Sequence, residues 1–112
     1  MVIMNADNGA VLGTADIGRG SDGCMFDPGL GMAYSSNGDG TVTVVSEVSP
    51  GKFETVSSIT TQQGARTMAL DPKTHRLYLS AATVAPPAEG QPQTGGRRNF
   101  VPNSFVVLVV GD

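Results

Sequence analysis

Tryptophan is absent from this sequence of 112 residues, and cysteine and histidine each occur once, as Cys24 and His75. A single cysteine excludes an intrachain disulfide framework and a zinc site built from cysteines alone. A single histidine likewise excludes a histidine-rich metal site. No metal site and no cofactor are expected in this chain.

Long apolar runs are also missing. The longest, residues 105–110, is far shorter than the roughly 20 residues that cross a bilayer, so no membrane span is predicted. Residues 1–10 lack the basic start and the sustained apolar stretch of a secretion signal. Either the protein is cytoplasmic or its signal lies outside this chain, and the sequence leaves the compartment unknown.

Neither sign of charge dominates. The chain has 7 basic and 10 acidic residues, for a formal net charge of −3. This mildly acidic balance argues against a nucleic acid or an anionic membrane surface as the partner. A hydrophobic content of 39% in 112 residues is typical of one globular domain rather than of a collagen or a disordered tail.

Glycine and proline are plentiful, with 15 and 7 residues, and they mark turns. The stretches between the turns are short and rich in β-forming residues, and none supports a helix of three turns. The pattern predicts an all-β fold of antiparallel strands. Nine strands are expected, at residues 2–4, 11–17, 24–26, 32–35, 41–45, 53–59, 67–70, 77–80 and 105–110.

An internal repeat is the strongest signal. Residues 20–36 align with 64–80 at an offset of 44, and residues 2–17 align with 44–59 at an offset of 42. Units of this length with four short strands have the dimensions of a β-propeller blade, about 40 to 50 residues. A β-sandwich is the main alternative, but its strands need not repeat their turn chemistry at a fixed interval. The matching positions include Gly20 and Gly64, Asp27 and Asp71, Pro28 and Pro72, Tyr34 and Tyr78, and Ser36 and Ser80.

Four motifs carry a family resemblance: Val2-Ile-Met-Asn-Ala-Asp-Asn-Gly9, Ser36-Asn-Gly-Asp-Gly-Thr-Val-Thr-Val-Val45, Gly64-Ala-Arg-Thr-Met-Ala-Leu-Asp-Pro72 and His75-Arg-Leu-Tyr-Leu-Ser80. Together they resemble the YVTN family of β-propeller repeats, the YncE-like proteins. The name-giving tetrapeptide is replaced by Ala33-Tyr-Ser-Ser36 and Leu77-Tyr-Leu-Ser80. The resemblance implies a bacterial, often periplasmic or secreted protein of four-stranded blades around a central channel.

This interpretation divides the chain into parts of three blades. Residues 1–19 supply the third and fourth strands of a first blade, 20–63 a complete blade, and 64–112 the first three strands of a last blade. That makes about two and a quarter blades, whereas propellers close with about 4 to 8. We expect either a fragment of a longer chain, of about seven blades, or a piece that self-associates to cover its bare blade faces. The run 105–110, apolar on both faces, is expected to pack between two sheets.

The connection at residues 85–103 is much longer than its counterpart at 37–40. It holds four prolines and three glycines, so it is predicted to be a flexible insertion. Long loops often carry function, but a pair such as Arg97 and Arg98 in a flexible loop is more often solvated than bound to an acidic partner.

Two motifs have simpler explanations than the chemistry they suggest. Residues 18–23 fit the G-x-G-x-x-G pattern of dinucleotide loops, but a strand rather than a helix is predicted to follow, so a glycine-rich connection is expected. Ser35, Asn37, Asp39 and Gly40 fit the first positions of a calcium loop, but position 12 is Ser46 instead of glutamate. A hairpin turn accounts for them.

The two single residues are predicted to be inert. His75 lies in the turn after Pro72 and is expected to face solvent. Cys24 is placed on an inner strand and is expected to be a buried thiol without a basic neighbour to activate it.

Three charged residues are the candidate ligand-binding set. Asp22 and Arg66 occupy the same phase of their units, just before the innermost strands, where a propeller faces its channel. Asp39 is the third. The alternative is that they only fix inter-blade loops by hydrogen bonds, and no acid–base partner makes any of them catalytic.

The sequence thus predicts a non-catalytic propeller scaffold for protein or small-molecule ligands, completed by copies of itself or by the missing blades of a parent chain. The main alternative is part of a propeller enzyme, a lactonase-like hydrolase or an oxidoreductase partner, with its site at the channel. A third reading is a purely structural remnant.

Overall fold

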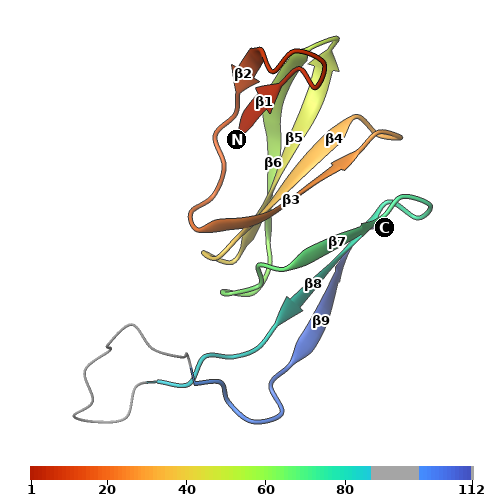
Figure 1. Ribbon diagram of the computed structural model, residues 1–112. Helices are drawn as coiled ribbons and strands as arrows, with labels where there is room; N and C mark the ends of the chain where they lie inside the picture. Colours follow the sequence, from red (N-terminus) through yellow and green to blue (C-terminus); the bar gives the residue numbers. More distant parts are fainter. Residues whose placement is uncertain (87–98, 112) are drawn as a thin grey trace.

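The computed structural model describes residues 1–86 and 99–111, and the fold of this part is all-β, without a helix (Figure 1). Accordingly, no helix of the described residues could cross a membrane. All nine predicted strands are present, and only their ends differ from the prediction. They are β1 (Val2–Met4), β2 (Val11–Thr14), β3 (Ser21–Asp27), β4 (Met32–Asn37), β5 (Thr41–Ser49), β6 (Lys52–Thr60), β7 (Met68–Asp71), β8 (Arg76–Ala81) and β9 (Val106–Val110).

The strands form three antiparallel sheets, which follow one another along an elongated molecule of 54 × 29 × 22 Å (Figure 1). The first sheet contains β1 and β2, the second has the order β3-β4-β5-β6, and the third has the order β7-β8-β9. Within each sheet, consecutive strands are neighbours. No sheet closes into a ring. The prediction of an all-β fold with antiparallel sheets is confirmed.

The second and third sheets share the same strand register. Four of the six residue pairs between β3 and β4 recur between β7 and β8, 44 residues later in the chain. The corresponding pairs are Cys24–Ser35 and Met68–Leu79, Met25–Tyr34 and Ala69–Tyr78, Phe26–Ala33 and Leu70–Leu77, and Asp27–Met32 and Asp71–Arg76. The repeat in the sequence is therefore also a repeat of strand pairing.

Strand β9 occupies the place in the third sheet that β5 has in the second. Tyr34 pairs with Val44 on β5, and the equivalent Tyr78 pairs with Val109 on β9. The short β4–β5 turn is replaced between β8 and β9 by a long connection, of which residues 87–98 lie outside the described residues. The predicted flexible insertion, with Arg97 and Arg98, falls mostly on that part. Its described ends pair as a short ladder, with a bridge between Val84 and Phe100.

The main core lies between the second and third sheets, where β3 contacts β7. Alternate residues of a strand point to opposite faces, so Leu77, Leu79 and Ala81 of β8 are buried against the second sheet. Tyr34, Val42 and Val44 meet them from the second sheet, and Ala65 and Met68 complete the buried cluster.

The prediction that residues 105–110 pack between two sheets is wrong. Leu108 and Val110 pack against the core, but Val107 and Val109 are 54% and 55% exposed. The physical reason is that nothing in the described part of the chain covers the far face of the third sheet. The first sheet is also thinly covered, and its Val2, Met4, Val11 and Leu12 are exposed.

Candidate functional site

The three charged residues predicted to face a channel lie around one depression. Asp22 and Arg66 line a hollow of about 600 Å³, and Arg66 and Asp39 line a neighbouring hollow of about 780 Å³. Gly64 and Arg66 belong to both, so the two hollows meet at Arg66. Asp22 lies on β3, Asp39 in the β4–β5 turn and Arg66 just before β7. The structure thus brings the three predicted residues together.

Arg66 is held by its backbone and by a neighbouring glycine. The Oγ atom of Ser36 donates a short hydrogen bond to the carbonyl oxygen of Arg66. The side chain passes over Gly38, where an added Cβ would lie 3.3 Å from Cδ of Arg66. Within residues 1–86 and 99–111, no carboxylate lies within 4.0 Å of the guanidinium group. Among the described residues, the charge of Arg66 therefore has no acidic partner.

Asp39 uses both carboxylate oxygens inside the protein. Oδ1 accepts a hydrogen bond from the hydroxyl of Thr41 at 2.7 Å, and Oδ2 accepts one from the backbone N–H of Arg19 at 2.8 Å. These two bonds, that from Thr41 above all, hold the pKa of Asp39 below its usual value. Asp39 thus fixes the connection before β3 to the β4–β5 turn. This is the loop-fixing role that the sequence left open for these residues.

The buried side-chain amide of Asn37 belongs to a second set of hydrogen bonds between the β4–β5 hairpin and the connection before β3. The Nδ2 atom of Asn37 donates to the hydroxyls of Thr41 and Thr43, each at 3.0 Å, and its Oδ1 accepts from the hydroxyl of Ser35 at 2.9 Å. The backbone N–H of Gly18 donates to the same Thr43 hydroxyl at 3.0 Å. Since buried polar groups need partners, this network orders the loop that supports one wall of the depression.

The alternative readings of two motifs are settled by the backbone. Residues 18–20 form a glycine-rich connection, and residues 21–23 already belong to β3, so a strand follows the connection, as predicted. Residues 37–41 form the tight β4–β5 hairpin turn, with Gly40 at a φ of 91°. In the described part of the chain, no group of three histidine, cysteine or acidic residues is arranged to hold a metal ion.

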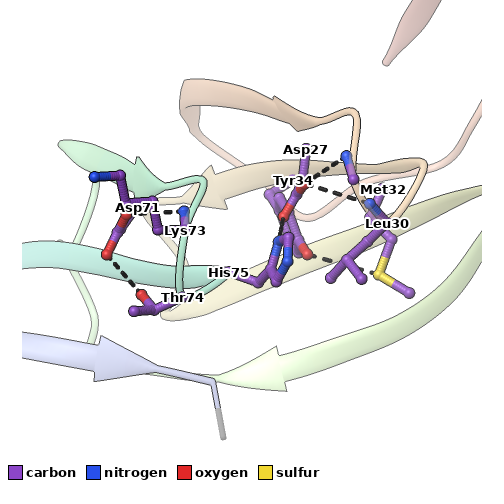
Figure 2. A network of polar contacts seen from close by, with 9 residues as sticks. Asp27, Leu30, Met32, Tyr34, Asp71, Lys73, Thr74 and His75 are labelled. Carbon is purple, nitrogen blue, oxygen red and sulfur yellow. Dashed lines mark hydrogen bonds and ion pairs between the residues drawn. The ribbon is translucent and has the colours of Figure 1, made fainter.

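A contact that the sequence did not predict joins the second and third sheets. Asp27 is fully buried, and its Oδ1 accepts hydrogen bonds from the backbone N–H groups of Gly29 and Leu30. Its Oδ2 lies 2.6 Å from Nδ1 of His75, which comes from the β7–β8 turn (Figure 2). The His75 side chain is 36% exposed, so it lies at the surface as expected, but the expectation missed its contact with Asp27. A buried carboxylate needs donors, and the histidine supplies one.

The ionised carboxylate of Asp27 determines that Nδ1 of its partner His75 carries a proton. Burial alone would raise the pKa of Asp27, but the hydrogen bonds from His75, Gly29 and Leu30 together hold it below its usual value. An ionised carboxylate only accepts hydrogen bonds, so Nδ1 of His75 is the donor. Such a pair orients the histidine of many hydrolases. Here, however, His75 lines neither hollow, and no described hydroxyl or thiol bonds to it.

Of the two residues in this contact, the sequence indicated only Asp27. The Asp-Pro turn recurs at Asp27 and Asp71, which marks the aspartate as a repeated feature. Its partner is 48 residues away on the next unit, and the position equivalent to His75 in the second sheet is Gly31. Both residues have the left-handed φ that ends the turn, 59° for His75 and 64° for Gly31, but only one carries a side chain.

The expectation of a buried thiol is also wrong, because Cys24 is exposed. Cys24 and Phe26 lie on the face of β3 opposite the core, because they pair with Ser35 and Ala33, whereas Met25 pairs with Tyr34 of the core cluster. The first sheet contacts the second through β2 and β6, at the opposite edge. Cys24 and Phe26 of β3 are therefore left exposed on that face.

Comparison with protein-family models, curated proteins and solved structures found no match for this chain.

Proposed function

We propose that this chain is a non-catalytic binding scaffold built from propeller-type repeats similar to YVTN units. The observation that carries the proposal is the recurrence of one strand register in two stacked sheets, 44 residues apart, with charged residues gathered where their first strands meet. In a propeller the first strand of every blade lines the central channel. Strands β3 and β7 are in contact, and the two hollows that meet at Arg66, together called the Arg66 depression, lie beside Asp22 near the start of β3 and Arg66 just before β7.

Three consecutive sheets are too few to close a propeller ring. Repeat proteins bury each unit against its neighbours, so bare terminal faces call for further units. Exposed valines on the first and third sheets fit that need. The chain would then work as a section of a larger propeller or as one subunit of an assembly.

The chemistry of the depression favours an anionic group on a protein or small-molecule ligand. A guanidinium group offers donors in a planar fork that suits carboxylates and phosphates. Arg66 has such a group without an internal counter-ion among the described residues, and Gln62 and Gln63 add amide groups to the same wall. Asp22, exposed on the opposite side of Arg66, would select against ligands with a second negative charge nearby.

A titration followed by nuclear magnetic resonance tests this proposal. Acetate and inorganic phosphate are added separately to the ¹⁵N-labelled protein, and backbone amide shifts are recorded. We expect saturable shifts confined to Gly20, Gly38, Gly64 and Arg66 in the wild type. We expect them to be lost in R66A and kept in K73A, which removes an exposed lysine from the β7–β8 turn. Shifts spread over the whole surface, or equal shifts in R66A, would contradict ligand contact at Arg66.

The same sample separates the scaffold from the enzyme alternative. Lactone and ester substrates are added and their hydrolysis is followed in the one-dimensional spectrum. We expect no turnover above the rate of buffer. Hydrolysis that disappears in D22N or R66A would replace the scaffold by a hydrolase with its site in this depression.

A further inference from the structure

The third sheet ends in a strand with one free edge. In the second sheet, β5 pairs with β4 on one side and β6 on the other. Its counterpart β9 pairs with β8 on one side, and no described strand lies on the other (Figure 1). The backbone N–H and C=O groups along such an edge are ready to pair with another chain.

This edge also lacks the usual protection. Proteins guard edge strands with charges, prolines or bulges. Strand β6, at the edge of the second sheet, carries Lys52 and Glu54, and its register with β5 shifts twice. Strand β9 has neither a charged residue nor a proline, and its register with β8 is uninterrupted.

The sequence of β9 is self-complementary. Val106-Val-Leu-Val-Val110 reads the same in both directions. If two copies pair antiparallel about Leu108, that residue faces the partner's Leu108, and Val107 faces the partner's Val109. Residues opposite each other lie on the same face of a sheet, and pairs of β-branched residues are favourable there. The exposed Val107 and Val109 of both copies would then meet on one face.

We propose that β9 is a self-association edge, and that its occupant is β9 of a second copy of this chain. The two copies pair antiparallel with a two-fold axis at Leu108, which makes one six-stranded sheet in the order β7-β8-β9-β9-β8-β7. Both copies use the same edge, so the assembly closes as a dimer. This inference depends on neither the propeller arrangement nor the Arg66 depression, so each can fail without the other.

Two double variants of exposed positions test the pairing and its register by light scattering. In V107K/V109K, introduced lysines face lysines of the partner at both positions, and we expect the mass to fall from twice the chain mass to that of one chain. In V107K/V109E, each introduced lysine faces an introduced glutamate of the partner, and we expect the dimer to return. V56K, which changes a valine of β6 that is 51% exposed, is the matched control and should stay dimeric.

Circular dichroism establishes that the variants are folded, and hydrogen exchange on the wild type adds a test without substitution. We expect the amides of residues 106–110 to exchange more slowly in concentrated than in dilute samples. A wild type that is monomeric at every concentration overturns the proposal. So does a folded V107K/V109K dimer, a V107K/V109E monomer, large irregular aggregates in place of a discrete dimer, or exchange in β9 that does not depend on concentration.

Discussion

The Nδ1 atom of His75 donates a hydrogen bond of 2.6 Å to the buried Oδ2 of Asp27, which joins the turn of the third sheet to the end of β3 in the second. Asp71 holds the equivalent place in the third sheet, but within the described part of the chain its carboxylate bonds to Lys73 and Thr74 of its own turn (Figure 2). Asp27 and Asp71 thus each support the turn of their own unit, and within the described contacts Asp27 also joins two sheets.

We therefore expect D27N to be more destabilising than D71N. The first substitution weakens three hydrogen bonds at a fully buried carboxylate, whereas the second affects a partly exposed turn. For a domain of this size, D27N should lower the melting temperature by about 5 °C more than D71N. Thermal unfolding followed by circular dichroism measures both. Equal losses would show that the contact between the sheets adds nothing to the turn.

Stability should fall in acid. Asp27, Asp39 and Asp71 all have a pKa below the ordinary value of 3.8. Their unfolded forms take up protons first, so their contribution is complete above that value and is lost as the pH falls through the lower native pKa values. Urea unfolding between about pH 6 and about pH 2 measures the trend. A free energy of unfolding that stays constant over this range would contradict it, and D39N should flatten the acid slope.

Gly18 should not tolerate a side chain. A Cβ there would lie 2.5 Å from Nδ2 of Asn37 and 2.6 Å from Oγ1 of Thr41. G18A should therefore cost about 1 to 3 kcal/mol, because the buried network has to shift. Gly13 is the matched control, since its Cβ would meet no atom within 4 Å, and G13A should change stability by less than about 1 kcal/mol. Chemical denaturation compares the two, and a harmless G18A would refute the packing of this loop.

Cys24 should react with a thiol reagent in the folded protein. Its exposure predicts labelling by a maleimide without denaturant, at a rate close to that of the urea-unfolded chain. Mass spectrometry during a time course gives the rate. Labelling that requires unfolding would restore the sequence-based expectation of a buried thiol.

The internal repeat of the sequence predicted part of the candidate site. The offset of 44 residues placed Asp22 and Arg66 at equivalent points of two units, and equivalent points of stacked sheets come close together. Asp39 was the third candidate, and its hydrogen bonds to Arg19 and Thr41 give it a structural role. Asp27 and His75 could not be paired in this way, because their contact joins different positions of two units.

What the sequence determined by itself is local. Turn residues and alternating β-formers predicted nine strands, and the repeat predicted two units built alike, because strand pairing across short turns depends on neighbours in the chain. Only the tertiary structure decided which faces are covered. It left Cys24 and Val109 exposed and buried Asp27 against His75. Burial depends on which sheets come to lie against one another, and no pattern within a single strand records that.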